Sequence, residues 1–160
     1  MSRIAISLCG EGRGHATRIG TLVERLEADH DILVFTSNDA WDLLSRRFAT
    51  GHPRVRVAEI PGIVFEYTDG RLDVMRSIAT GLDYQARVLG PLVDRLIGEL
   101  DAFGAELAVA DFEPGLPRAA ARQEIPLISL DHQHFLLAYE LDSLPWSLQW
   151  NAWFMSHAVW

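Results

Sequence analysis

The sequence predicts an α/β fold: a Rossmann-like parallel sheet with helices on both faces. Three observations lead to this prediction. Short apolar segments of strand length recur along the chain, helical segments with one apolar face separate them, and glycine or proline residues mark the boundaries. Strands that alternate with helices need crossover connections, and such connections make neighbouring strands parallel. We expect residues 1–142 to form this domain.

The elements follow in order along the chain. The expected strands are residues 4–8, 31–36, 55–60, 107–110 and 126–130. The expected helices are residues 17–28, a helix from a cap at Ser37 or Asn38 to about Phe48, residues 73–103 and residues 117–123. Gly90-Pro91 is expected to break or kink the third helix, because proline cannot continue the hydrogen-bond ladder. Residues 9–15 and 61–70 are expected to be loops.

Composition limits the class of protein. The chain has 160 residues, 49% of them hydrophobic, and a net charge of −8, which argues against a nucleic-acid-binding surface. Cys9 is the single cysteine, so no internal disulfide forms and a reducing compartment is expected. Cys9 is either a small apolar filler or a reactive thiol. No apolar segment is long enough to span a membrane, so we expect a cytoplasmic protein, with peripheral contact with the inner face of the membrane left open.

Residues 143–160 are unusually rich in tryptophan. Trp146, Trp150 and Trp153 fall on one helical stripe. The stripe packs either in a core or between domains, or it contacts a partner or the membrane interface. The chain stops inside this aromatic segment, so we expect a truncated domain that self-associates through the bared stripe.

Polar clusters directly follow three of the expected strands. They are residues 10–18, 111–113 and 131–134. Because ligands of parallel sheets bind at the carboxyl ends of the strands, these clusters predict a site at one edge of the sheet. This edge is the main physical indication of function.

The first cluster is a glycine loop, Gly10-Glu11-Gly12-Arg13-Gly14-His15. It departs from the dinucleotide fingerprint, which needs glycine where His15 stands, and from the P-loop, which needs a following Lys-Ser/Thr. The loop is either a tight strand-to-helix turn or a place where an anionic group docks against backbone N–H groups. At the helix N-terminus, the ring of His15 is expected to stay neutral and able to accept a proton, or else to cap the helix.

The other two clusters hold a carboxylate and two histidines. Asp111 either caps the helix that follows its strand or accepts the N–H of His15 and orients the ring. His132 and His134 share a face of an extended segment, with Asp131 on the other. Metal binding, hydrogen bonding to a substrate and structural roles are the alternatives for these residues; without a companion metal motif, we expect no metal.

The motif Gly10-Glu11-Gly12-Arg13-Gly14-His15-Ala16-Thr17-Arg18 resembles the opening of bacterial GT-B glycosyltransferases near glycosyltransferase family 28, relatives of the peptidoglycan N-acetylglucosaminyl transferase. Residues 111–114 and 125–134 resemble two further segments of that group. The resemblance implies that residues 1–142 are the N-terminal, acceptor-side half of a GT-B fold. It assigns catalysis to His15 as base and Asp111 as its partner. We expect the substrate to be bound by Gly12, Arg13, Gly14, Arg18, Glu113, His132 and His134.

The implied activity is transfer of a sugar from a nucleotide-sugar donor to a hydroxyl acceptor, such as a glycan, a lipid or a small molecule. The donor-binding C-terminal domain is expected to be absent from these residues, which leaves the chain inactive alone. No cofactor or metal is expected, since helix dipoles assist the leaving diphosphate. The alternatives are a nucleotide-sugar 2-epimerase or hydrolase of the same fold, and a binding module without chemistry.

Overall fold

The computed structural model describes residues 1–130 and 142–154, and it confirms the α/β fold class. Five parallel strands form one sheet in the order β3-β2-β1-β6-β7. The strands are β1 (Arg3–Leu8), β2 (Asp31–Thr36), β3 (Val55–Glu59), β6 (Leu107–Asp111) and β7 (Leu127–Ser129). The helices are α1 (Arg13–Leu26), α2 (Asn38–Arg47), α3 (Val74–Asp83), η1 (Tyr84–Val88), α4 (Leu89–Phe103), α5 (Gly115–Arg122) and α7 (Trp146–Phe154).

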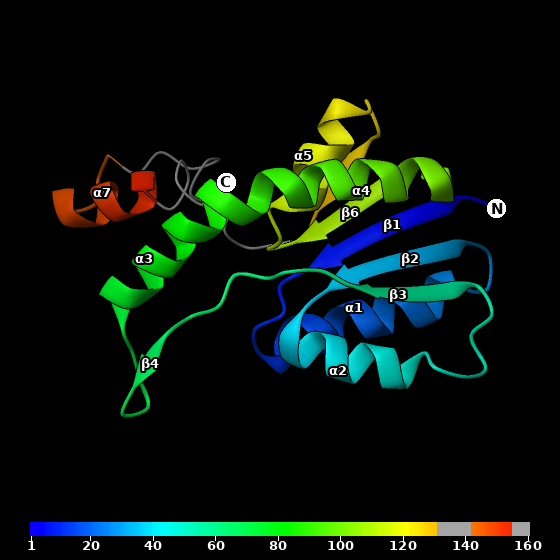
Figure 1. The fold of residues 1–160 in the computed structure, drawn as a ribbon, viewed down its shortest axis with the longest axis horizontal. Helices are drawn as coiled ribbons and strands as arrows, with labels where there is room; N and C mark the ends of the chain where they lie inside the picture. Colours follow the sequence, from blue (N-terminus) through cyan, green and yellow to red (C-terminus); the bar gives the residue numbers. More distant parts are fainter. Residues whose placement is uncertain (131–141, 155–160) are drawn as a thin grey trace.

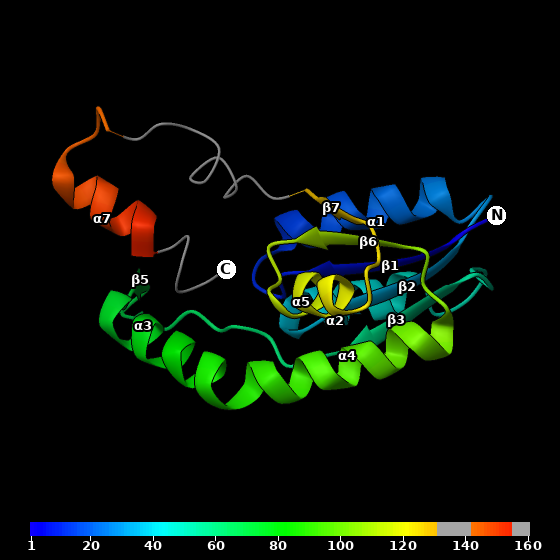
Figure 2. The ribbon, with the colours of Figure 1, turned by 90° about the horizontal axis from the view of Figure 1, so that it is seen from above.

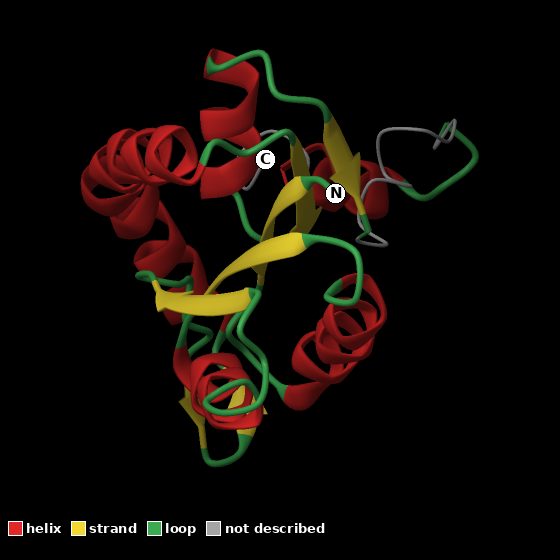
Figure 3. Cartoon of the chain, turned by 90° about the vertical axis from the view of Figure 1, so that its right-hand side faces the viewer, coloured by secondary structure: helices red, strands yellow, loops and turns green. Residues whose placement is uncertain are grey.

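Helices cover both faces of the sheet, with α1 and α2 on one face and α4 and α5 on the other (Figure 1, Figure 3). The strands alternate accordingly. In β2, Ile32 and Val34 pack in the cluster under α1 and α2, whereas Leu33 and Phe35 pack in the cluster under α4 and α5. This alternation follows from the two-residue repeat of a strand, which sends successive side chains to opposite faces. The sheet core is therefore closed on both sides.

Residues 64–83 form an arm that extends beyond the sheet (Figure 1, Figure 2). At the end of the expected loop and just after it, β4 (Tyr67–Thr68) and β5 (Arg71–Leu72) form a short antiparallel hairpin. Asp69 and Gly70 make its turn, with φ of 51° and 73°. An Asp-Gly pair with positive φ at both positions is the preferred two-residue hairpin turn. The expected loop therefore contains a strand, β4, and a hairpin turn at Asp69-Gly70, which the prediction missed.

The expected interruption of the long helix takes the form of a π-helical turn. Residues 84–88 are π-helical, and the N–H of Leu89 donates to the carbonyl of Tyr84, five residues earlier. Helix α4 then continues through Gly90 and Pro91. π-Turns and prolines are common causes of a change in helix direction, and the axis bends between α3 and α4 (Figure 2). The helix is thus bent but unbroken.

The tryptophan segment forms the expected helix, α7, yet it does not lie in the domain core. The side chains of Trp146 and Trp150 are 80% and 57% exposed. Within residues 1–130 and 142–154, no helix combines the length and the apolar character that crossing a membrane requires.

The loops after β1, β2 and β3 meet around Ser37. A Cβ atom added to Gly10 would lie 2.1 Å from the Ser37 hydroxyl oxygen and 2.6 Å from its carbonyl oxygen. A Cβ atom on Gly62 would lie 1.9 Å from the same hydroxyl oxygen. Ser37 is itself buried, so neither it nor its backbone has room to move. The absence of a side chain at both glycines lets the three strand ends converge.

We expect Gly10→Ala to destabilise the domain by about 1–3 kcal/mol, because the new methyl group meets backbone atoms that cannot yield cheaply. Thermal unfolding followed by circular dichroism measures the effect as a lower Tm. Gly14→Ala is the matched control. A Cβ atom there meets nothing within 4 Å, so its Tm should stay the same or rise slightly. Equal Tm values for both variants would contradict the proposed crowding.

Candidate functional site

The glycine loop is a sharp turn that starts α1 next to the end of β6. Gly12 has φ of 75°, a left-handed value that favours glycine, and α1 begins at the next residue. The N–H of Cys9 donates to the carbonyl of Asp111 at 2.9 Å, which ties the loop to β6. Apart from chain neighbours and the backbone of α1 itself, no atom of residues 1–130 and 142–154 lies within 4 Å of a Cβ added to Gly12 or Gly14, so the described part of the chain leaves one side of the turn open. A ligand can approach the backbone there.

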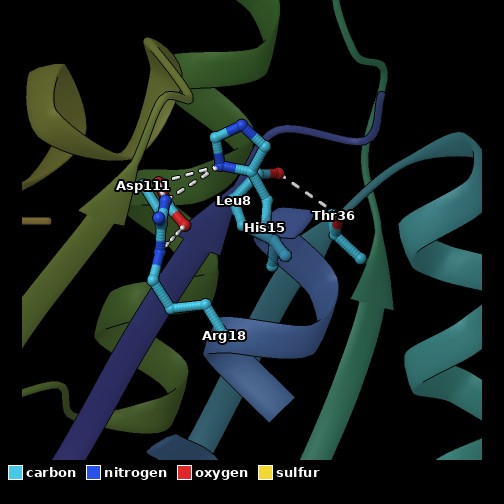
Figure 4. Close-up of polar contacts among 5 residues, drawn as sticks. All are labelled: Leu8, His15, Arg18, Thr36 and Asp111. Atoms are coloured by element: carbon cyan, nitrogen blue, oxygen red, sulfur yellow. Dashed lines mark hydrogen bonds and ion pairs between the residues drawn. The ribbon is translucent and has the colours of Figure 1, made fainter. Parts of the chain in front are cut away.

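His15 and Asp111 are in contact, although 96 residues separate them in the chain. His15 lies in the first turns of α1, and Asp111 is the last residue of β6. The ring Nδ1 lies 2.9 Å from Oδ1 of Asp111 (Figure 4). The Asp111 side chain is fully buried, while that of His15 is 24% exposed. The structure therefore confirms the predicted proximity of the two groups.

Arg18 binds the same carboxylate. Its Nε donates to Oδ2 of Asp111 at 3.1 Å, and its Nη2 donates to Oδ1 at 2.6 Å. Arg18 follows His15 by three positions, so both side chains leave the same face of α1. The spacing of these two residues was the signal that could have predicted a shared partner.

The electrostatics of Asp111 fix the tautomer of His15. Burial alone would raise the pKa of Asp111, but hydrogen bonds and charge from His15 and Arg18 outweigh burial and hold the pKa below its ordinary value. An ionised carboxylate only accepts hydrogen bonds, so Nδ1 of His15 carries the hydrogen. The lone pair then resides on Nε2. Within the described part of the chain, no residue hydrogen-bonds to Nε2. This nitrogen lies on the side of the ring that points away from Asp111 (Figure 4).

Phe112 and Glu113 shape the turn after β6. Phe112 has φ of 58°, an uncommon value for a bulky residue, and its ring stacks on that of His15 with centroids 6.1 Å apart. Glu113 is buried and accepts the N–H groups of Gly115 at 2.6 Å and Leu116 at 2.9 Å. Glu113, and not Asp111, therefore caps α5, which corrects the capping alternative for Asp111.

Glu113 also departs from its expected role in substrate binding. Burial raises its pKa, although the two backbone N–H groups act in the opposite direction. Because the side chain is buried and both oxygens are occupied by backbone N–H groups, it presents no atom to a ligand. We assign Glu113 to the support of the Asp111 turn.

The remaining candidate residues are Arg13, Cys9 and the pair His132 and His134. Arg13 lines a groove of about 560 Å³ between α1 and α2, on another face of the helix, together with Thr17, Asp39, Asp42, Leu43, Arg46 and Arg47. Cys9 is buried, and this burial raises the pKa of its thiol, which favours the filler interpretation over a reactive thiol. His132 and His134, with Asp131, lie outside the described residues.

A second hollow, which the sequence did not indicate, lies at the ends of β2 and β3. It has a volume of about 330 Å³ and is lined by Ser37, Asn38, Glu59, Ile60, Pro61, Gly62 and Arg95. Asn38 has φ of 46° and donates to Glu11 of the glycine loop at 3.4 Å. The hydroxyl of Thr36 donates to the carbonyl of Leu8 at 3.3 Å, which joins the ends of β2 and β1 (Figure 4). This hollow adjoins the glycine loop on the side of α2.

In the described ranges 1–130 and 142–154, no group of three or more His, Cys, Asp or Glu side chains is arranged to hold a metal ion. The arrangement at this edge is instead that of a histidine with one nitrogen fixed by a buried carboxylate and the other available. Such a pair can take a proton from a hydroxyl group and hold the resulting positive charge.

Comparisons with known proteins agree with the fold. The crystal structure of SsfS6, a glycosyltransferase of Streptomyces sp. SF2575, is similar with a TM-score of 0.54 and 18% identity, over 82% of this chain and 39% of that one. The chain thus spans about two fifths of the length of SsfS6. The zinc-inhibited form of the teicoplanin deacetylase Orf2 gives a TM-score of 0.44 and 16% identity, over 79% of this chain and 66% of that one. A search of curated proteins gives no match.

The likeness to SsfS6 supports the assignment of this α/β domain to one Rossmann-like half of a GT-B fold. The finer resemblance to glycosyltransferase family 28 stays a prediction. A family model described as Glycosyl transferase family 1 matches residues 2–158, which is nearly the whole chain. The chain therefore belongs to the Glycosyl transferase family 1.

Proposed function

We propose that this chain is the acceptor-side domain of a glycosyltransferase that moves a sugar from a nucleotide-sugar donor to a hydroxyl acceptor. One observation carries the proposal: the 2.9 Å contact between Nδ1 of His15 and the buried carboxylate of Asp111, at the ligand-binding edge of the sheet. Membership of the Glycosyl transferase family 1 supports the reaction class. The donor would bind to a part of the protein that these residues do not include.

In the proposed step, Nε2 of His15 removes the proton of the acceptor hydroxyl as its oxygen attacks the anomeric carbon. The bond between that carbon and the diphosphate oxygen breaks, and the nucleoside diphosphate leaves with the electron pair. Asp111 stabilises the imidazolium that forms and keeps the ring oriented. Gly12 and Gly14 leave space for the acceptor or diphosphate beside the loop.

Several finer expectations belong to the same proposal. We propose a cytoplasmic protein that needs no metal ion, with peripheral membrane contact and self-association through the tryptophan segment as further expectations. The exposed side chains of Trp146 and Trp150 support an external contact of α7. Arg13 and the two histidines at 132 and 134 stay predicted substrate contacts.

The first test measures nucleoside diphosphate release by the complete protein that contains these residues, with UDP-, GDP- and TDP-sugars and a panel of hydroxyl acceptors. We expect His15→Ala to lower kcat by about 10²–10⁴, since the general base is lost, with little change in donor KM. His30→Gln, on a histidine at the opposite edge of the sheet, is the matched control and should keep full activity.

Two outcomes would redirect the proposal. Release of free sugar without any acceptor would favour a hydrolase or 2-epimerase on the same site. Full activity of His15→Ala would end the role of His15 as base and favour a domain that only binds.

A second test concerns Asp111→Asn. The lowered pKa of Asp111 means that its charged form stabilises the folded state above the ordinary carboxyl pKa, and that this contribution disappears as the pH falls through the lowered value. We expect the variant to be less stable by about 2 kcal/mol near pH 7, and the difference to shrink on acidification. Urea unfolding at a series of pH values measures it. A difference that is constant down to strongly acidic pH would show that the charge of Asp111 is not involved.

A further inference from the structure

Two side chains of α1 share one buried carboxylate. Arg18 contacts both oxygens of Asp111, through Nε and Nη2, whereas His15 contacts Oδ1 alone. Since the Asp111 side chain is fully buried, it has no water to replace either donor. The orientation of the carboxylate is therefore set by the two-point contact with Arg18, and the ring of His15 meets an acceptor that is already fixed.

The charge of Arg18 also acts on the ring. Its Nη2 lies 3.3 Å from Nδ1 of His15, and Oδ1 of Asp111 lies 2.9 Å from the same ring nitrogen. A guanidinium keeps its positive charge throughout the accessible pH range. Positive charge at this distance opposes protonation of the ring, whereas the carboxylate favours it. The two effects act in opposite directions on the same imidazole.

Several other ionisable groups of the described residues lie near this end of α1, among them Arg13, which lines the groove toward α2. Cys9 and Glu11 lie in the preceding loop, and Glu113 follows Asp111. Glu113 is occupied by backbone N–H groups, and burial keeps the thiol of Cys9 neutral. Glu11 is engaged with Asn38, and Asp39 lies beyond it on α2. The direct ionic contacts of His15 are with Asp111 and Arg18.

We propose that Arg18 is a positioning residue, which fixes both oxygens of Asp111 for His15 and whose positive charge acts on the ring in the direction opposite to that of the carboxylate. This inference rests on the proposed function for its catalytic meaning. It replaces the expectation that Arg18 binds the substrate directly. The half-exposed Arg18 would then affect turnover and its pH dependence more than substrate affinity.

The experiment compares Arg18→Met, which removes the charge, with Arg18→Lys, which keeps the charge without the two-point contact. Arg25→Met is the matched control, because Arg25 is an exposed arginine of the last turn of the same helix. The complete protein is used. NMR follows the titration of the His15 ring, assigned by its loss in His15→Asn, and steady-state kinetics give kcat and KM against pH.

We expect Arg18→Met to move the titration of His15 to higher pH by about one unit or more, because the carboxylate then acts unopposed. The acid limb of the kcat profile should move in the same direction, with KM changed less than about threefold. Arg18→Lys should bring the pH at which His15 titrates close to that of the wild type, but it should recover only part of kcat. Arg25→Met should resemble the wild type in both measurements.

A double variant keeps the inference testable if Arg18→Met folds poorly. Arg18→Met with Asp111→Asn removes both charges, and the titration of His15 should return toward the wild-type position. An unchanged titration in Arg18→Met, together with a tenfold rise in KM, would overturn the inference in favour of direct substrate binding. A shifted titration in a protein without transferase activity would leave the inference standing and reject the proposed function.

Discussion

A carboxylate buried at the end of a strand must be paired, and at Asp111 both partners come from a single helix. The side chain has no exposure to water, so the domain folds stably only when α1 places its donors against β6. This requirement sets the distance between the first helix and a strand that follows it by more than eighty residues. The sharp turn at Gly12 and the bond from Cys9 to the backbone of Asp111 serve the same placement. Local geometry at the loop thus follows from one long-range ionic contact.

The neighbouring loops add a second constraint at the same edge. Gly10 and Gly62 both abut Ser37, and the hydroxyl of Thr36 bonds the end of β1. Three strand ends are therefore packed too closely for side chains at the two glycines. On the other side of the site, Glu113 fixes the turn that carries Asp111 and holds Phe112 against the ring of His15. The turns that carry Asp111 and Phe112 beside His15 are consequently held in place, as the proposed role of this histidine as a proton acceptor requires.

Sequence patterns predicted the five strands of the sheet and their parallel arrangement, because strands that alternate with helices need crossover connections. They also predicted that polar residues at the ends of the strands would meet, and the contact between His15 and Asp111 confirms this prediction. The patterns did not distinguish which acid caps α5, because Asp111 and Glu113 are both in range and only tertiary packing decides. The hairpin at Asp69-Gly70 was missed because its strands have two residues each, too few for a periodic signal. The three-residue spacing of His15 and Arg18 placed both side chains on one face of α1, but the carboxylate that they share is decided by tertiary packing.

The groups of the site divide according to the rigidity of the elements that carry them. His15 and Arg18 belong to a helix, and Asp111 belongs to a central strand, so their mutual geometry is fixed by the sheet. Gly12 and the hollow near Asn38 belong to loops, and the arm at 64–83 extends beyond the core. Loops tolerate change in sequence and length far better than buried strands do. A domain built in this way can keep one proton-transfer device constant while its loops change the acceptor that reaches it. In the proposed function, proton transfer would therefore depend on the buried ion pair, and the choice of acceptor would depend on the surrounding loops.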